Sequence, residues 1–227
     1  MVICTMEKKI LTVEPSAVSL DTILSDLHMS REHKSYGKVA ALYEAALKIV
    51  KPVALYAAFT PEERDGAIWL NGVKFEEPFV YEMLSGCDIV IPYVASCGRE
   101  IDEWSLAFTD LFEQFAADVI KESCVDAVLD QLNREAREKY FNAGTSPSSI
   151  NPGSLEAWPI TGQRPLFEIL GGASGVAEDI GVTLKDSLMM IPTKSVSGIL
   201  FPSDTPYHNC QLCQKENCPE RTAPYEG

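Results

Sequence analysis

Three cysteines near the C-terminus are the residues in this sequence best suited to chemistry. Cys210, Cys213 and Cys218 stand in a C-x2-C-x4-C spacing, which places three sulfurs within one tight turn and its return. The two thiolates of a C-x2-C turn can be directed at one metal ion. A third nearly completes a tetrahedral zinc site or the non-exchanging positions of an iron–sulfur cluster. The spacing therefore predicts a zinc or iron–sulfur centre.

The run of three thiols lacks a fourth ligand, and two residues could supply it. His208 is close in sequence and suits zinc, whereas Cys97, in a separate Ser-Cys-Gly-Arg-Glu loop, suits a cluster. Two other interpretations of the tail remain open. Cys210 and Cys213 could form a redox pair, or the three thiols could have no special role.

The remaining composition favours a cytoplasmic protein with reduced thiols. The chain has seven cysteines, an odd number, and 46% hydrophobic residues, enough to bury a core without disulfides. The first residues carry charges in place of an apolar signal core. Cys87 and Cys124 lie in apolar segments and are expected in the core, whereas Cys4 is expected to have no role.

The charge of the chain argues against two classes of partner. Nineteen Lys and Arg residues and 33 Asp and Glu residues give the chain a formal net charge of 19 − 33 = −14 at pH 7. A negative field repels phosphate backbones and anionic lipid surfaces, so we expect no nucleic-acid and no membrane partner. No stretch approaches the roughly 20 apolar residues of a membrane helix.

The elements that must position these residues form an α+β pattern with an antiparallel or mixed sheet and long helices, because strands and helices do not alternate as βαβ units. Asn71-Gly72 between two apolar runs predicts a hairpin. A strand is predicted at 87–94, and Pro92 either weakens it or places it near an edge. Residues 103–140 form two helices or one helix with a kink near Ser123, and 141–158 form a loop. We expect one domain over 1–205 and a cysteine-containing tail over 206–227.

A series of short motifs stands in the last third of the chain. They are Asn151-Pro152-Gly153, Trp158-Pro159, Gly181-Val182-Thr183-Leu184-Lys185-Asp186-Ser187, Met190-Ile191-Pro192 and Lys194-Ser195-Val196-Ser197-Gly198. With these motifs, the chain resembles the reactivation (activation) domain of cobalamin-dependent methionine synthase. The resemblance covers most of the chain from about residue 35 and is strongest over the last third. The cysteine tail resembles that of free-standing relatives of this domain.

The resemblance implies a role with a partner that carries cobalamin. The partner would be a corrinoid-binding protein or a shortened methionine synthase, together with an electron-donor protein. The reactivation domain docks over the corrinoid, so that an electron and a methyl group from S-adenosylmethionine restore an oxidised cofactor. The cofactors carry the chemistry, and the protein supplies position and environment. Any enzymatic activity would then be that of a methyltransferase component.

The sequence departs from the family at its S-adenosylmethionine loop. The family motif is Arg-x-x-x-Gly-Tyr, and its glycine corresponds to Gly153. The arginine position falls on Ser149 and the tyrosine position on Ser154, while a second aromatic contact corresponds to Tyr207. An arginine would grip the methionine carboxylate with two parallel hydrogen bonds, which serine cannot do.

Two other functions remain open alongside electron delivery to a partner corrinoid. One is a non-catalytic binding module that holds a corrinoid or another small ligand and is stapled by zinc. The other is an enzyme that uses S-adenosylmethionine on a substrate unrelated to cobalamin. The identity of the metal separates the first from electron delivery, because zinc has no redox chemistry.

Overall fold

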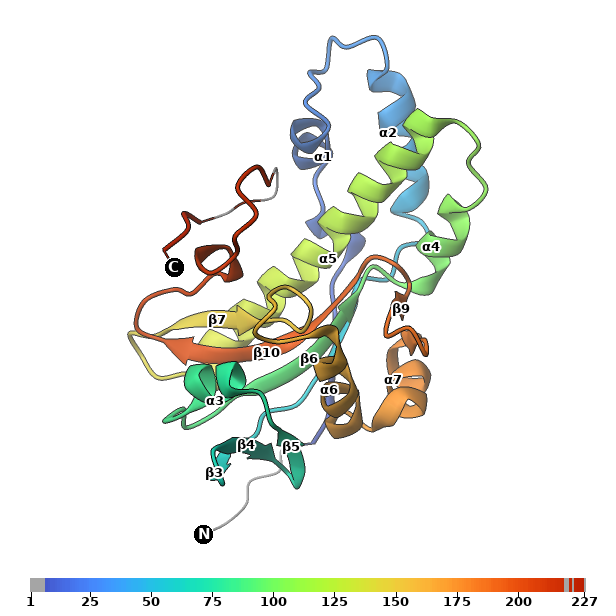
Figure 1. Cartoon of the computed structure of the whole chain (residues 1–227). Coiled ribbons are helices and arrows are strands. Elements are labelled where there is room, and N and C mark those ends of the chain that lie inside the picture. The colour runs from blue at the N-terminus through green and yellow to red at the C-terminus, as the bar shows by residue number, and fades with distance from the viewer. Residues whose placement is uncertain (1–6, 219–220, 222, 227) are drawn as a thin grey trace.

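An antiparallel sheet forms the centre of the fold (Figure 1). A computed structural model describes residues 7–218, 221 and 223–226, so Cys4 lies outside the described residues. The strand order is β1-β2-β6-β10-β7, and every neighbouring pair is antiparallel. The strands are β1 (Lys9–Thr12), β2 (Val53–Tyr56), β6 (Ile91–Ser96), β10 (Ser195–Ser203) and β7 (Ser146–Ile150).

One face of this sheet is covered by the long helix α5 (Leu111–Lys139). Side chains alternate between the faces of a strand, and Tyr56, Tyr93 and Leu200 lie on the α5 face, where they pack with Val128 and other residues of the helix. The helix begins at Asp110, whose carboxylate accepts a hydrogen bond from the backbone N–H of Glu113 at 3.0 Å.

The opposite face of the sheet carries the larger apolar cluster. Leu55, Val94 and Ile199 point to this side and pack with three short helices and a small second sheet. The helices are α3 (Pro78–Leu84), α6 (Gln163–Ile169) and α7 (Gly172–Ile180), and the small sheet contains β3 (Glu62–Arg64), β4 (Ala67–Leu70) and β5 (Val73–Phe75). The antiparallel α+β architecture predicted from the sequence is confirmed.

A third cluster fills the end of the molecule away from the small sheet. The N-terminal half of α5 packs there with α1 (Leu20–Asp26), α2 (Tyr36–Ala46) and α4 (Arg99–Ser105) (Figure 1). Ser19 caps α1 by accepting from the N–H of Thr22 at 3.0 Å. A two-stranded piece, β8 (Thr183–Leu184) with β9 (Met190–Ile191), leads into β10. Three 3-10 turns complete the described elements: Pro15–Ala17, Ile160–Gly162 and Asn209–Gln211.

The hairpin predicted at Asn71-Gly72 is confirmed. β4 and β5 pair across this dipeptide, and both of its residues have positive φ, 47° for Asn71 and 84° for Gly72. A two-residue turn of this kind matches the twist of the strands it joins, which explains why the dipeptide is a strong local signal.

The prediction that Pro92 places its strand near an edge is wrong. Pro92 lies in β6, which is the middle strand of the five. The sheet tolerates the missing N–H of Pro92 because the regular pairing of β6 with β2 ends at the preceding pair, Tyr56 with Tyr93. Beyond that point the Pro92 carbonyl still accepts a hydrogen bond from the N–H of Ala57 at 3.3 Å.

The segment expected to be a loop at 141–158 contains strand β7. The sequence Ser-Pro-Ser-Ser-Ile has little strand propensity of its own, but its backbone pairs with β10 over five positions. The break or kink predicted near Ser123 within 103–140 is absent, because α5 runs unbroken from Leu111 to Lys139. The break comes at 106–110, between α4 and α5.

Every helix within the described residues is too short or too polar to span a lipid bilayer.

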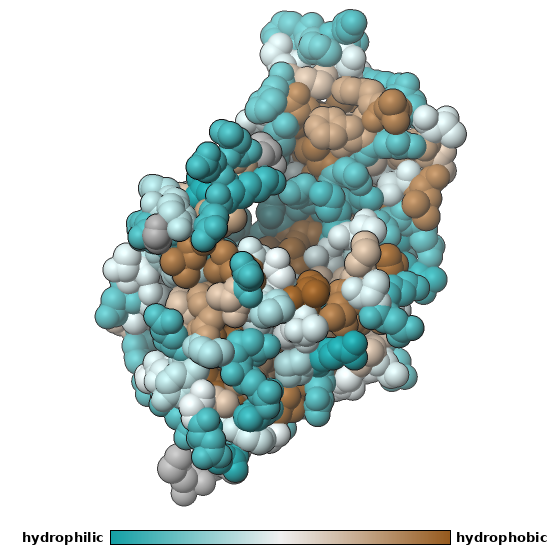
Figure 2. All heavy atoms as spheres, viewed as in Figure 1, coloured by the Kyte–Doolittle hydropathy of each residue, from teal (hydrophilic) through white to brown (hydrophobic). Residues whose placement is uncertain are grey.

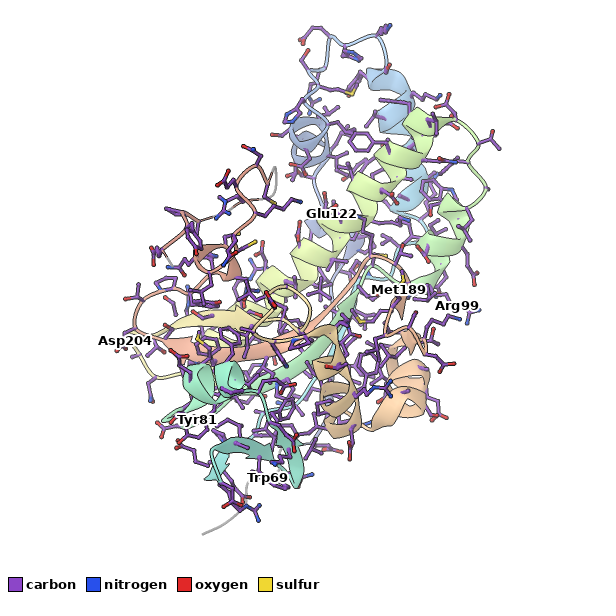
Figure 3. All side chains as sticks on the ribbon, in the orientation of Figure 1. Trp69, Tyr81, Arg99, Glu122, Met189 and Asp204 are labelled. Carbon is purple, nitrogen blue, oxygen red and sulfur yellow. The ribbon has the colours of Figure 1, made fainter. Side chains whose placement is uncertain are left out.

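After β10 the chain bends near Asp204 (Figure 3) and returns along the β7 edge of the sheet. Tyr207 and Cys213 pack against the large apolar cluster, so this segment is attached to the body of the molecule. The division into a domain at 1–205 and a tail at 206–227 stays a prediction.

Candidate functional site

The cysteine segment folds into two linked turns. The N–H of Cys213 donates to the carbonyl of Cys210 at 3.3 Å, which closes the C-x2-C segment into a single turn. A second turn lies at 216–217, and the N–H of Arg221 donates to the carbonyl of Cys218 at 3.3 Å. All three cysteines are half-buried. The turn geometry predicted for Cys210 and Cys213 is therefore present.

Arg221 holds these two turns together, a role that sequence reasoning missed. Its guanidinium donates to the carbonyls of Cys210 at 2.8 Å, Cys213 at 2.9 Å, Lys215 at 2.6 Å and Ala223 at 3.3 Å. A guanidinium carries five N–H donors in one plane, so it can serve several carbonyls of a compact loop at once. The available signal was a single arginine three residues after the last cysteine.

The donor set of the tail suits a metal, but the described residues do not form a complete site. Three sulfurs from two linked turns match the chemistry of zinc and of iron–sulfur clusters. Among the described residues, however, no three His, Cys, Asp or Glu side chains are grouped so that they could hold a metal ion. His208 directly precedes the 3-10 turn that contains Cys210. The metal centre stays a prediction.

Cys97 lies in a different part of the molecule from the cysteine turns. It follows β6, is fully buried, and packs in the helical cluster with Cys124, whereas Cys213 packs against the cluster on the α3 and α6 side of the sheet. Burial raises the pKa of the Cys97 thiol to about 12 and that of Cys124 to about 12. The structure thus does not bring Cys97 to the tail.

The tail is attached to β7 and to the loop that follows it by side-chain hydrogen bonds. The N–H of Tyr207 donates to Ser148 Oγ at 2.8 Å, and Asn209 Nδ2 donates to Asn151 Oδ1 at 2.9 Å. The ring of Tyr207 lies 6.4 Å from the ring of Phe201, measured between centroids. Burial raises the pKa of the Tyr207 hydroxyl to about 12.

A polar network beneath this attachment fixes Asn151. Its Nδ2 donates to Tyr93 Oη at 2.9 Å and to the carbonyl of Ser197 at 2.9 Å, and Tyr93 Oη also lies 2.9 Å from Ser149 Oγ. A Cβ on Gly198 would come within 2.4 Å of Asn151 Nδ2, so only glycine leaves room for this amide. Asn151 thereby links β6, β7, β10 and the tail.

The loop after Asn151 carries Gly153 in a conformation that requires glycine. Its φ is 86°, its N–H donates to the carbonyl of Trp158 at 2.8 Å, and a Cβ there would lie 2.8 Å from Ile160 Cδ1. Ser154 continues the same loop through a hydrogen bond from its N–H to the carbonyl of Asn151 at 3.2 Å.

A cleft of about 440 Å³ separates this loop from the cysteine turn. Ser154, Leu155, Glu156 and Ala157 line one wall, and Leu212, Cys213 and Gln214 line the other. Figure 2 shows this face of the molecule hollowed beside the tail. The structure therefore brings the Gly153 loop, Tyr207 and the cysteine turn into one region.

Three buried polar atoms in and beneath this region have no hydrogen-bond partner within the described part of the chain. They are Ser197 Oγ, Tyr207 Oη and Asn209 Oδ1. Buried polar atoms are rarely left unpaired, because desolvation without compensation costs about 1–3 kcal/mol. These atoms mark the region as one able to bind a polar ligand or water.

The residues at the family's S-adenosylmethionine positions do not fit that ligand's carboxylate. Ser149 stands where the motif has arginine, and its hydroxyl is held in the network by Tyr93 and, at 3.3 Å, by Asn151 Oδ1. A neutral hydroxyl within such a network offers no charge-assisted fork. The loop keeps the glycine of the motif but not the group that would recognise an amino-acid carboxylate.

Comparisons with known proteins support a fold relationship. No protein-family model matches the chain, and no curated protein matches it. Among solved structures, it is similar to the crystal structure of the MetH reactivation domain bound to AdoHcy, with a TM-score of 0.64 and 15% sequence identity. The match covers 91% of this chain and 82% of that chain. The predicted reactivation-domain fold is confirmed.

Proposed function

We propose that this protein acts as a separate reactivation-domain-like partner of a corrinoid-binding protein or a shortened methionine synthase. It would support the reductive reactivation or methylation of the partner's cobalamin. The observation that carries the proposal is the shared fold, which extends over 91% of the chain. Such a protein supplies position and environment for chemistry that belongs to the cofactor.

The loop and tail favour the reductive part of this role. Ser149 leaves the carboxylate of S-adenosylmethionine without its charged partner, while Cys213 of the tail lines the cleft beside the same loop. The proposed role of this chain therefore includes no methyl-transfer step of its own. The cleft walled by Ser154–Ala157 and Leu212–Gln214 is the surface we assign to the partner's corrinoid or to another ligand.

We further propose that Cys210, Cys213 and Cys218 hold a zinc ion or an iron–sulfur cluster, with His208 as the nearest candidate for a fourth ligand. An iron–sulfur cluster exchanges single electrons, whereas zinc does not. The closed turn at Cys210 and Cys213 and the carbonyl contacts of Arg221 support a compact ligand set. With an iron–sulfur cluster, the tail would pass electrons from a donor protein to the partner's cobalamin. With zinc, the tail would have only a structural role.

Reconstitution with a corrinoid protein tests the main proposal. The purified chain would be mixed with the cobalamin-binding module of a methionine synthase that carries cob(II)alamin, in the presence of a one-electron donor. We expect a complex by sedimentation and a faster loss of the cob(II)alamin absorbance than without the chain. Absence of both effects would overturn the proposal. The variant Glu156→Gln, at an exposed residue of the cleft wall, tests the cleft as the contact surface.

Metal analysis of protein kept free of oxygen tests the tail. Iron with sulfide and visible absorbance would support electron transfer, whereas zinc alone would support a metal-stapled binding module. If protein that has not been exposed to chelators contains neither metal, both versions are contradicted. Calorimetry with S-adenosylmethionine addresses the third possibility, since an enzyme using this cofactor would give heat of binding.

A further inference from the structure

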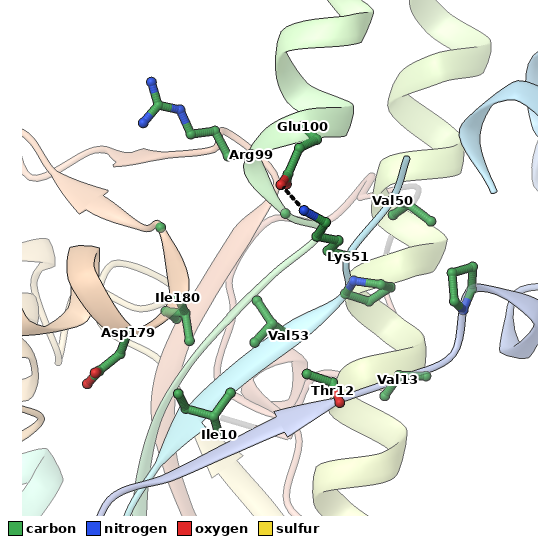
Figure 4. A pocket seen from close by; sticks show the side chains of 14 residues that line it. Ile10, Thr12, Val13, Val50, Lys51, Val53, Arg99, Glu100, Asp179 and Ile180 are labelled. Atoms are coloured by element: carbon green, nitrogen blue, oxygen red, sulfur yellow. Dashed lines mark hydrogen bonds and ion pairs between the residues drawn. The ribbon is translucent and has the colours of Figure 1, made fainter. Parts of the chain in front are cut away.

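A second cavity lies at the β1 edge of the sheet and shares no residue with the cleft beside the tail. Its volume is about 490 Å³, which falls within the usual range for small-molecule sites. Strands β1 and β2 form its floor, and the start of α4 and the end of α7 form its sides (Figure 4). Nothing in the proposed function uses it.

The floor of this cavity is apolar. Ile10, Val53 and Ile180 converge on it from β1, β2 and α7 (Figure 4). Ile10 is 52% exposed, although its cross-strand partner Leu55 is fully buried. An exposed isoleucine beside a concave apolar surface is a position at which an apolar ligand side chain is removed from water on binding.

The mouth of the cavity carries a pair of opposite charges. Lys51 Nζ, just before β2, and a carboxylate oxygen of Glu100, in the first turn of α4, form an ion pair across it (Figure 4). Lys51 lowers the pKa of Glu100, so this carboxylate is charged at neutral pH. Both side chains remain accessible, with 71% and 46% of their surfaces exposed, so a ligand can reach them.

The backbone fixes where these two charges stand. Gly98 precedes α4 with a φ of 95°, and a Cβ there would lie 2.8 Å from the carbonyl oxygen of Lys51. The two segments therefore touch through their main chains, and the side chains leave from a rigid crossing. This gives the mouth a defined spacing between its positive and negative groups.

The other charges around the rim are already paired elsewhere. Arg99 binds Glu103 on its own helix at 2.8 Å and points outward in Figure 3, and Asp179 binds Lys8 at 2.7 Å. Neither is directed at the apolar floor in Figure 4. The two charges that meet across the mouth are thus those of Lys51 and Glu100.

We propose that this cavity binds a small zwitterion with an apolar side chain, that is, an apolar α-amino acid. Its carboxylate would pair with Lys51, its ammonium group with Glu100, and its side chain would cover Ile10, Val53 and Ile180. A simple anion would displace Glu100 from Lys51 and leave the Glu100 carboxylate unpaired. A simple cation would displace Lys51 from Glu100 and leave the Lys51 ammonium group unpaired. A zwitterion satisfies both partners at once.

Calorimetric titration with L-norleucine tests the proposal. Hexanoate lacks the ammonium group, pentylamine lacks the carboxylate, and glycine lacks the apolar side chain. We expect norleucine to bind at least about tenfold more tightly than each of the three, since each of them lacks one of the contacts that norleucine makes. Absence of norleucine binding, or equal affinity for hexanoate, would overturn it.

Variants of the lining complete the test. Lys51→Met, Glu100→Gln and Ile10→Glu should each weaken norleucine binding by about tenfold or more. Because these side chains are exposed, thermal unfolding should change little. The matched control is the exposed ion pair between Lys74 and Glu76, at 2.8 Å, where Lys74→Met and Glu76→Gln should leave binding unchanged. Undiminished binding in the first three variants would contradict the assignment.

Discussion

The cysteines of the helical core and those of the tail show how one residue type is put to different uses. Cys97 and Cys124 are covered on all sides, and burial raises the pKa of each thiol to about 12. Cys213 and Cys218 lie half-buried in turns whose carbonyls are held by one guanidinium. Surroundings, rather than the presence of a thiol, decide which cysteines can take part in chemistry.

Alkylation should give the largest difference between the two regions. After removal of metal with a chelator, iodoacetamide should modify Cys213 and Cys218 at least about a hundredfold faster than Cys97 and Cys124, because the core thiols are both protonated and shielded. Peptide mass spectrometry over a time course measures each site separately. Comparable rates at the two sets would show that the helical core opens readily.

The pH dependence of stability should distinguish the core thiols next. In the unfolded chain a thiol loses its proton near its usual pKa of 9.0, whereas the folded core keeps it up to about 12. The folded state therefore holds more protons between these values. Its free energy of unfolding should fall as pH rises above 9, by about 1.4 kcal/mol per pH unit for each thiol.

Urea unfolding at several alkaline pH values measures this slope. The Cys97→Ala and Cys124→Ala variants should each be less stable at neutral pH, because they leave small cavities. Each should also lose part of the alkaline slope, while a Cys218→Ala variant should keep all of it. A wild-type slope that none of the core variants reduces would contradict the buried, protonated state.

Loss of Arg221 should affect the tail alone. Arg221→Met removes the donors to the carbonyls of Cys210, Cys213, Lys215 and Ala223. We expect amide exchange in the cysteine turns to rise about tenfold or more, with little change in global unfolding, since no core side chain depends on this residue. Arg221→Lys should restore only part of the protection, because an ammonium group cannot serve four separated carbonyls.

The sequence predicted those parts of the molecule that depend on local signals. The Asn71-Gly72 hairpin and the C-x2-C turn each follow from neighbouring residues. The polar strand β7 was missed because its pairing with β10 spans about fifty positions of sequence. The position of Pro92 in the sheet was predicted wrongly because the point at which β6 stops pairing with β2 depends on both strands. The sequence of β6 alone does not show it.

The candidate site divides in the same way. The cysteines were recognisable by type and spacing, but their position beside the Gly153 loop depends on Asn209 and Asn151, which are 58 residues apart. Nor does the spacing show that Cys97 belongs to the helical core. Long-range contacts of this kind are set by the packing of the whole chain, so a single sequence carries only weak signals for them.

The smallest effect on stability is expected from two tyrosine hydroxyls. One of them is hydrogen-bonded beneath the tail, and the other belongs to the tail itself. Tyr93 Oη is paired with Ser149 and Asn151, whereas Tyr207 Oη is buried without a partner in the described part of the chain. Tyr93→Phe should cost about 1–3 kcal/mol because it leaves Asn151 and Ser149 short of a partner, and Tyr207→Phe should be neutral or stabilise by up to about 1 kcal/mol. Urea unfolding compares the two variants. A clear loss in Tyr207→Phe would mean that this hydroxyl is bound in solution, by water or by a ligand in the cleft. Repeating the urea unfolding with the cob(II)alamin module present would then separate these two cases. Only a ligand contact makes the loss of unfolding free energy depend on the partner.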